Sequence, residues 1–122
     1  MIFKQVFDKK TSTYTYLIAS SQGREALIID PVLENVEDYI KLLTELDLKL
    51  VKVIDTHIHA DHVTGASKLK SLTKCITIMG NHTPTDAVEI KVKDNESIKI
   101  DQLKIRALYT PGHTSDSFSF LM

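Results

Sequence analysis

The feature that most constrains the fold is a segment of helical periodicity between two short apolar runs. Residues 25–30 (EALIID) predict a strand that ends at Pro31, and residues 49–55 (KLVKVID) form a β-branched run typical of a buried strand. Between them, apolar residues recur at helical spacing: Val36, Tyr39, Ile40, Leu43 and Leu46. Strand, helix and strand in this order predict a βαβ unit within an α/β fold.

Further elements are predicted on both sides of this unit. A short helix is expected at residues 65–72 (GASKLKSL), and the alternation of AVEIKVK at residues 87–93 predicts a strand with one face in water. The Asp101-Gln102 pair separates two runs that form a predicted hairpin. The predicted strands outside the βαβ unit are residues 2–7, 13–19, 75–79, 87–93, 96–100, 103–109 and 118–122.

The composition is that of a globular protein and argues against a nucleic-acid or membrane surface. The chain has 122 residues, of which 43% are hydrophobic and 25% charged, and its net charge is −1. No apolar run approaches the roughly 20 residues of a membrane-spanning helix, and the N-terminus lacks the apolar core of a signal peptide. The single cysteine suits a reducing compartment. We therefore expect one cytoplasmic domain, residues 1–122, with no nucleic-acid or membrane partner.

The segment DTHIHADHVTG, residues 55–65, contains three of the five histidines in the chain. In extended backbone, residues two apart point the same way, so His57, His59 and Asp61 converge on one side and His62 turns towards a neighbouring position. Imidazole and carboxylate groups are the usual ligands of zinc, iron and manganese. The alternative is a solvated polar loop, in which the clustering would be accidental. We predict a metal site.

A second histidine segment could complete that site. His113 lies in TPGHT, a Pro-Gly turn that follows a strand, where a rigid loop can present a distant ligand. Asp30 ends its strand and is either a turn residue or a residue that orients the histidine-rich segment; we favour the second. Structural roles are predicted for the remaining candidates: His82, Cys75, Tyr14 and Tyr16.

Three motifs together resemble those of the metallo-β-lactamase fold superfamily. THIHADH has its H-x-H-x-D-H form, TPGHT is similar to its next metal-ligand motif, and LIIDP resembles its upstream strand-end aspartate. The resemblance implies an α/β (α+β) fold, a four-layer αβ/βα sandwich of two similar halves. The chain would cover the first half and the start of the second, and would therefore be an incomplete domain. Its exposed apolar face would then need self-association or the missing half.

Within the superfamily, HADHVTGASKLK resembles the persulfide dioxygenase branch. That resemblance implies oxidation of a small persulfide, such as glutathione persulfide, by O2 to sulfite and thiol. It also implies one Fe(II) held by His57, His113 and a carboxylate from a Gly-Asp motif that is not among residues 1–122. His59, Asp61 and His62 would surround the iron, where Asp61 and His62 orient ligands or handle protons.

Two alternatives remain open. A thioester hydrolase of glyoxalase II type would hold two zinc-like ions, with Asp61 and His62 as ligands of the second metal. Its relatives typically carry a bulky aromatic residue where this chain has Ala60. The third reading is an inactive metal-binding fragment, because the expected carboxylate ligand is absent. A nuclease is disfavoured by the charge balance.

Overall fold

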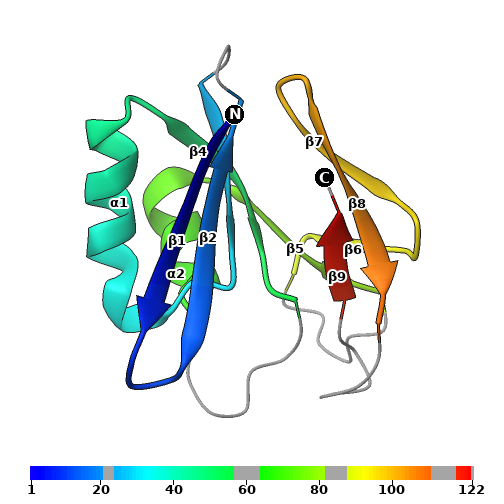
Figure 1. Ribbon diagram of the computed structural model, residues 1–122, viewed down its shortest axis with the longest axis horizontal. Helices are drawn as coiled ribbons and strands as arrows, with labels where there is room; N and C mark the ends of the chain where they lie inside the picture. The colour runs from blue at the N-terminus through cyan, green and yellow to red at the C-terminus, as the bar shows by residue number, and fades with distance from the viewer. Residues whose placement is uncertain (21–23, 57–63, 82–87, 111–117, 122) are drawn as a thin grey trace.

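The computed structural model describes residues 1–20, 24–56, 64–81, 88–110 and 118–121. The described strands form a six-stranded and a three-stranded sheet, which lie face to face (Figure 1). The helices α1 (Val36–Glu45) and α2 (Ala66–Thr73) cover the outer face of the larger sheet. None of the described helices is long and apolar enough to cross a membrane.

The larger sheet contains the predicted βαβ unit at its centre. Strand β3 (Glu25–Ile29) pairs in parallel with β4 (Lys49–Ile54), and the short 3₁₀ helix η1 (Leu33–Asn35) and α1 connect them. The sheet order is β1-β2-β3-β4-β5-β6. The two antiparallel pairings are β1/β2 and β2/β3, and those after β3 are parallel. The other strands are β1 (Ile2–Asp8), β2 (Thr13–Ala19), β5 (Ile76–Gly80) and β6 (Ile90–Val92).

The smaller sheet is antiparallel in the order β7-β8-β9. Its strands are β7 (Ser97–Ile100), β8 (Leu103–Tyr109) and β9 (Phe118–Leu121), which confirms the predicted hairpin around Asp101-Gln102. Asp101 takes a left-handed φ of 48° in that turn. Its carboxylate accepts the amide of Glu25 at 3.0 Å, and its own amide donates to the Glu25 carboxylate at 2.7 Å. This reciprocal pair ties the start of β3 to the smaller sheet.

One strand prediction was only partly right. In the described part of the alternating segment, residues 88–93, only the three residues of β6 form a ladder. Just before it, the amide of Glu89 donates to Thr77 Oγ1 at 3.1 Å, and the Glu89 carboxylate lies 2.9 Å from Lys70 Nζ. Glu89 therefore bonds to side chains on β5 and α2, and the parallel ladder begins only at the next residue.

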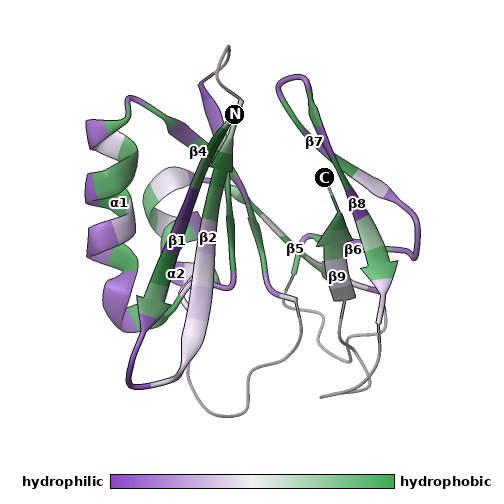
Figure 2. Ribbon diagram, in the orientation of Figure 1, coloured by the Kyte–Doolittle hydropathy of each residue, from purple (hydrophilic) through white to green (hydrophobic). Residues whose placement is uncertain are grey.

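The larger sheet is apolar on both faces, which explains why its central strands are continuous apolar runs. In β3, Ile28 packs towards the helices, whereas its neighbour Leu27 packs against the smaller sheet; neither is exposed. Figure 2 shows the hydrophilic residues of α1 alternating with apolar ones along the helix, as expected of a helix with one buried face. The two cores thus share the backbone of β3.

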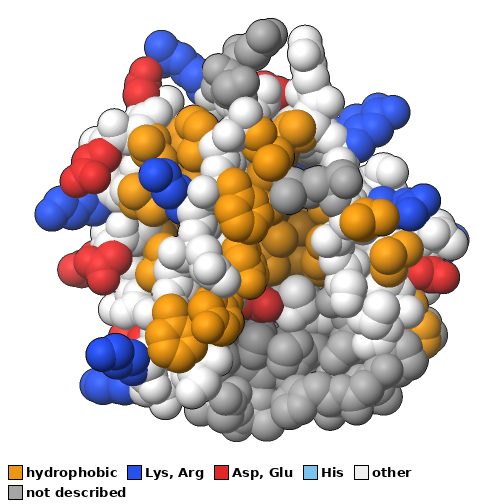
Figure 3. Space-filling model, in the orientation of Figure 1, with side chains coloured by type: hydrophobic (Ala, Val, Ile, Leu, Met, Phe, Trp, Pro, Cys, Tyr) orange, Lys and Arg blue, Asp and Glu red, His pale blue; other side chains and the backbone are white. Residues whose placement is uncertain are grey.

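The face of the β1–β2 hairpin that lies towards the smaller sheet is aromatic and open. Phe3 and Tyr16 have ring centroids 5.5 Å apart, and Phe7 and Tyr14 are 4.7 Å apart. These contacts confirm the predicted packing role of the two tyrosines, although Tyr14 is still 49% exposed. Apolar side chains gather in the middle of this side of the molecule (Figure 3).

Candidate metal centre

The predicted ligands all fall outside the described residues. His57, His59, Asp61 and His62 lie in the gap at 57–63, and His113 lies in the gap at 111–117. His82 likewise falls in a gap, at 82–87. Within the described ranges, no three His, Cys, Asp or Glu side chains cluster closely enough to hold a metal ion. The structure does describe the residues that come directly before and after these segments, and we call the residues that hold them the framework of the site.

The histidine-rich segment departs from the carboxyl end of β4, in the middle of the parallel part of the sheet. This is the edge where open α/β sheets hold their ligands. Strand β8 ends and β9 begins at the same edge of the molecule, in the smaller sheet that faces β4 (Figure 1). The segment that contains His113 joins those two strands. The fold therefore brings the departure points of both histidine segments to one edge.

Asp30 fixes the residue immediately before His57. One carboxylate oxygen of Asp30 accepts the backbone N–H of Thr56, and the other accepts the Thr56 hydroxyl, each at 2.8 Å. The amide of Asp30 donates to the carbonyl of Ile54 at 2.7 Å. This double contact supports the interpretation that Asp30 orients the start of the histidine-rich segment.

Thr64 and Gly65, which follow residues 57–63, are held by the turn that comes after β3. Thr64 donates its hydroxyl to the buried carboxylate of Asp55 at 2.8 Å. The amide of Gly65 donates to the carbonyl of Pro31 at 2.8 Å, and Thr64 forms an isolated antiparallel bridge with Val32. The residues that flank segment 57–63 are therefore anchored on both sides to the turn that follows β3.

Gly65 is required by a close approach of this anchor to the first residue of α1. A Cβ on Gly65 would lie 2.8 Å from Cγ2 of Val36 and 3.2 Å from the carbonyl oxygen of Val32. We expect Gly65→Ala to lower the free energy of unfolding by about 1–3 kcal/mol, measured by urea denaturation. The matched control is Ser67→Ala, an exposed position in α2, which should change it by no more than about 0.5 kcal/mol. Equal stability of the two variants would mean that the atoms around Gly65 can move aside at no cost in free energy.

The sequence did not identify Thr56 and Thr64 as part of this framework. The two threonines immediately flank residues 57–63, a position where hydroxyl side chains often bond to nearby backbone and carboxylate groups. That local preference is the available signal. Their partners could not be read from the sequence, because Asp30 meets Thr56 only through the pairing of β3 with β4.

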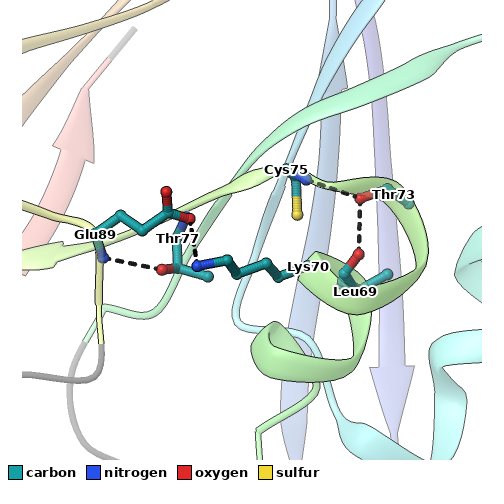
Figure 4. A network of polar contacts seen from close by, with 6 residues as sticks. All are labelled: Leu69, Lys70, Thr73, Cys75, Thr77 and Glu89. Atoms are coloured by element: carbon teal, nitrogen blue, oxygen red, sulfur yellow. Dashed lines mark hydrogen bonds and ion pairs between the residues drawn. The ribbon is translucent and has the colours of Figure 1, made fainter.

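A second polar network surrounds Cys75 at the start of β5 (Figure 4). The Thr73 hydroxyl donates to the carbonyl of Leu69 at 2.7 Å and accepts the amide of Cys75 at 3.2 Å. Cys75 is only 2% exposed, which confirms its prediction as a small buried residue, and burial raises the pKa of its thiol. The salt bridge from Lys70 lowers the pKa of the Glu89 carboxyl. The hydrogen bonds of Thr73 link the end of α2 to the start of β5, and the ion pair links α2 to the residue before β6.

Cys75 should be unreactive in the folded chain. At about pH 8, the raised thiol pKa leaves little thiolate, and burial blocks access to it. We expect iodoacetamide not to alkylate Cys75 until the chain is unfolded. Mass spectrometry measures the extent of alkylation. The control is an exposed thiol, Ser71→Cys in a Cys75→Ser background, which should react readily. Rapid alkylation of native Cys75 would show that the turn between α2 and β5 opens frequently.

An apolar cleft lies beside the framework, between the two sheets. It has a volume of about 380 Å³ and reaches Thr56, so the histidine-rich segment departs from its wall. The lining residues are Phe3, Tyr16, Ile18, Ile29, Thr56, Ile105 and Phe120. Among the described residues that line it, Tyr16 and Thr56 carry the polar side-chain groups, both hydroxyls.

Comparison with known proteins places these features in a family. The chain is 35% identical to the persulfide dioxygenase ETHE1, mitochondrial, of Bos taurus, over all of this chain and 48% of the bovine protein. It is 33% identical to the hydroxyacylglutathione hydrolase of Dictyostelium discoideum, over 89% of this chain and 41% of that one. The chain thus spans about half the length of these relatives.

The structure is also similar to that of a solved protein. The crystal structure of ETHE1 from Myxococcus xanthus superimposes with a TM-score of 0.95 and 42% identity, over 99% of this chain and 53% of that one. This agreement confirms the predicted fold class. The profile of the Metallo-beta-lactamase superfamily matches residues 9–87, which contain the βαβ unit and the histidine-rich segment. The chain belongs to the metallo-β-lactamase superfamily.

Proposed function

We propose that this chain provides the N-terminal part of a mononuclear iron persulfide dioxygenase, which oxidises glutathione persulfide or a similar small persulfide with O2 to sulfite and the thiol. The observation that carries the proposal is that the histidine-rich segment leaves the carboxyl end of β4 at Thr56, and Asp30 holds Thr56 by two hydrogen bonds. The 35% identity to a persulfide dioxygenase over the whole chain supports the choice of reaction.

The donor set fits a metal ion. Segment 57–63 contains imidazole and carboxylate groups, which are usual metal ligands, and the residues on either side of it, Thr56 and Thr64, are held by Asp30 and Asp55. In the proposal, His57 and His113 hold the iron and Asp61 and His62 orient ligands or handle protons, with His59 beside them. Bound iron(II) would supply open positions for the persulfide sulfur and O2.

The remaining ligand and the covering half of the sandwich have to come from outside residues 1–122 in this proposal. The relatives are about twice as long, since the chain covers 48% of the bovine protein. We propose that residues 1–122 form one incomplete domain, completed by a segment that supplies the carboxylate. The lone buried thiol supports the proposed reducing, cytoplasmic setting.

A second candidate is a dinuclear thioester hydrolase. The 33% identity to a hydroxyacylglutathione hydrolase favours it, and Asp61 and His62 would then bind a second zinc-like ion. Ala60 weighs against this candidate, because glyoxalase II relatives typically have a bulky aromatic residue there. The metal count separates the two candidates.

The test is metal analysis followed by two assays. The chain, alone and within its complete product, is purified without oxygen, and its metals are measured by inductively coupled plasma mass spectrometry. We expect one iron per chain and O2 uptake with glutathione persulfide by the complete product. Two zinc ions with hydrolysis of S-lactoylglutathione would establish the hydrolase instead. Metal binding with neither activity would leave an inactive metal-binding protein.

A further inference from the structure

A chain of buried hydroxyl groups ends at Asp30, on the helix side of the larger sheet. It begins at Tyr39 in α1 and continues through Thr15 in β2, and both residues are only 2% exposed. Thr15 Oγ1 lies 2.7 Å from the carbonyl oxygen of Asp30 and 3.0 Å from the Tyr39 hydroxyl. The amide nitrogen of Val32 lies 3.1 Å from the same Tyr39 hydroxyl.

The direction of each hydrogen bond follows from donor counting. A carbonyl oxygen can only accept, so Thr15 uses its one hydrogen to donate to Asp30. The contact with Tyr39 is then donated by Tyr39, whose own oxygen accepts the amide of Val32. The order is therefore Val32 N–H to Tyr39, Tyr39 to Thr15, and Thr15 to Asp30. Each buried hydroxyl in this chain both donates and accepts.

This chain of bonds matters because Asp30 has an unfavourable backbone conformation. Its φ is 56°, in the left-handed region that residues with a Cβ seldom occupy. The Asp30 amide is held by Ile54, and its carbonyl is held by Thr15. With the peptide groups on both sides fixed, the carboxylate is directed at Thr56.

We propose that Tyr39 and Thr15 are positioning residues for the proposed metal centre. They act through Asp30, which holds the residue preceding His57, from the face of the sheet opposite the cleft. The inference rests on the proposed function for the identity of the site. It adds two residues, one on a helix that contributes no predicted ligand, to the set that determines metal affinity.

The first test does not depend on metal and uses amide hydrogen exchange followed by NMR. In Tyr39→Phe and in Thr15→Val, the Thr56 amide should exchange about tenfold faster, as expected when one hydrogen bond of its support is lost. The Asp55 amide, which donates to Ile78 at 3.1 Å, should be unaffected and is the internal reference. Thr15→Ser retains the hydroxyl and should restore slow exchange.

A matched control separates positioning from general stability. Thr77 is another buried threonine of the same sheet, but its hydroxyl accepts the amide of Glu89 and does not contact Asp30. Thr77→Val should lower the melting temperature as Thr15→Val does, yet leave Thr56 exchange unchanged. Unchanged Thr56 exchange in both Tyr39→Phe and Thr15→Val would overturn the inference.

The second test titrates the metal-free complete product, which includes the segment that supplies the third ligand, with cobalt(II), detected by its visible absorption. We expect the Kd for cobalt to rise about 10–100-fold in Tyr39→Phe and Thr15→Val, as for other residues that support metal ligands indirectly, and to be unchanged in Thr77→Val. Faster Thr56 exchange with unaltered cobalt affinity would also overturn the inference. If the unmodified complete product binds no cobalt, the proposed metal centre fails, and the exchange measurement still decides whether the hydroxyl chain holds Asp30.

Discussion

Replacement of His57 or His113 by alanine is expected to remove iron from the chain. In the proposed site each supplies one of only three protein ligands. Loss of a residue that only supports a ligand lowers metal affinity about 10–100-fold, and the loss here should therefore be larger. The measurement is the metal content of the complete product, which includes the third ligand, after anaerobic purification. His82→Ala is the control, because His82 is predicted to have a structural role and should leave the iron content unchanged.

The same experiment distinguishes the two candidate functions when it is extended to Asp61 and His62. With a single iron, Asp61→Asn and His62→Ala should weaken binding without changing its stoichiometry, since these residues would not touch the metal. In a two-metal hydrolase, either substitution should reduce the metal content from two ions towards one. Full iron content in His57→Ala would contradict the assignment of the ligands altogether.

Much of the fold could be predicted because the strands and helices carry strong local patterns. The continuous apolar run of β3, buried on both faces, and the helical spacing of Val36, Tyr39 and Leu43 follow directly from where each side chain packs. The prediction weakened at residues 87–93, where the pattern was equally regular. There Glu89 bonds to Thr77 and Lys70, a tertiary arrangement that alternation cannot reveal.

The candidate site divides in the same way. The ligand residues form a recognisable motif, and they remain predictions because they lie outside the described residues. The supporting residues carry no motif: Tyr39 occupies an apolar position of α1, and only its hydroxyl distinguishes it from a packing residue. Buried tyrosine hydroxyls usually find a partner, but that partner is Thr15, 24 positions away along the chain. Such pairs become visible only once the order of strands and helices is known.

Leu27→Ala is expected to cost about 2–5 kcal/mol in the free energy of unfolding, a large share of the about 5–15 kcal/mol typical of a domain. Leu27 is unexposed and belongs to the core between the two sheets, which also contains Ile54, Ile100 and Ile105. The cavity left by the substitution would lie between sheets that are held rigidly by their backbone ladders, so little collapse can offset the loss. Urea denaturation followed by circular dichroism measures the effect, and Leu72→Ala, at a position 57% exposed, is the control.

The next residue of the same strand tests whether the two cores unfold together. Ile28 is equally buried but packs against the helices, so Ile28→Ala removes a side chain from the other core. Because β3 contributes alternate residues to both cores, neither can lose its packing without disturbing the other. We expect both variants to show one transition, with the same midpoint by circular dichroism and by tyrosine fluorescence. Two separate transitions in Leu27→Ala would mean that the smaller sheet, joined to β3 by the Glu25–Asp101 pair, can detach while the helix-covered sheet stays folded.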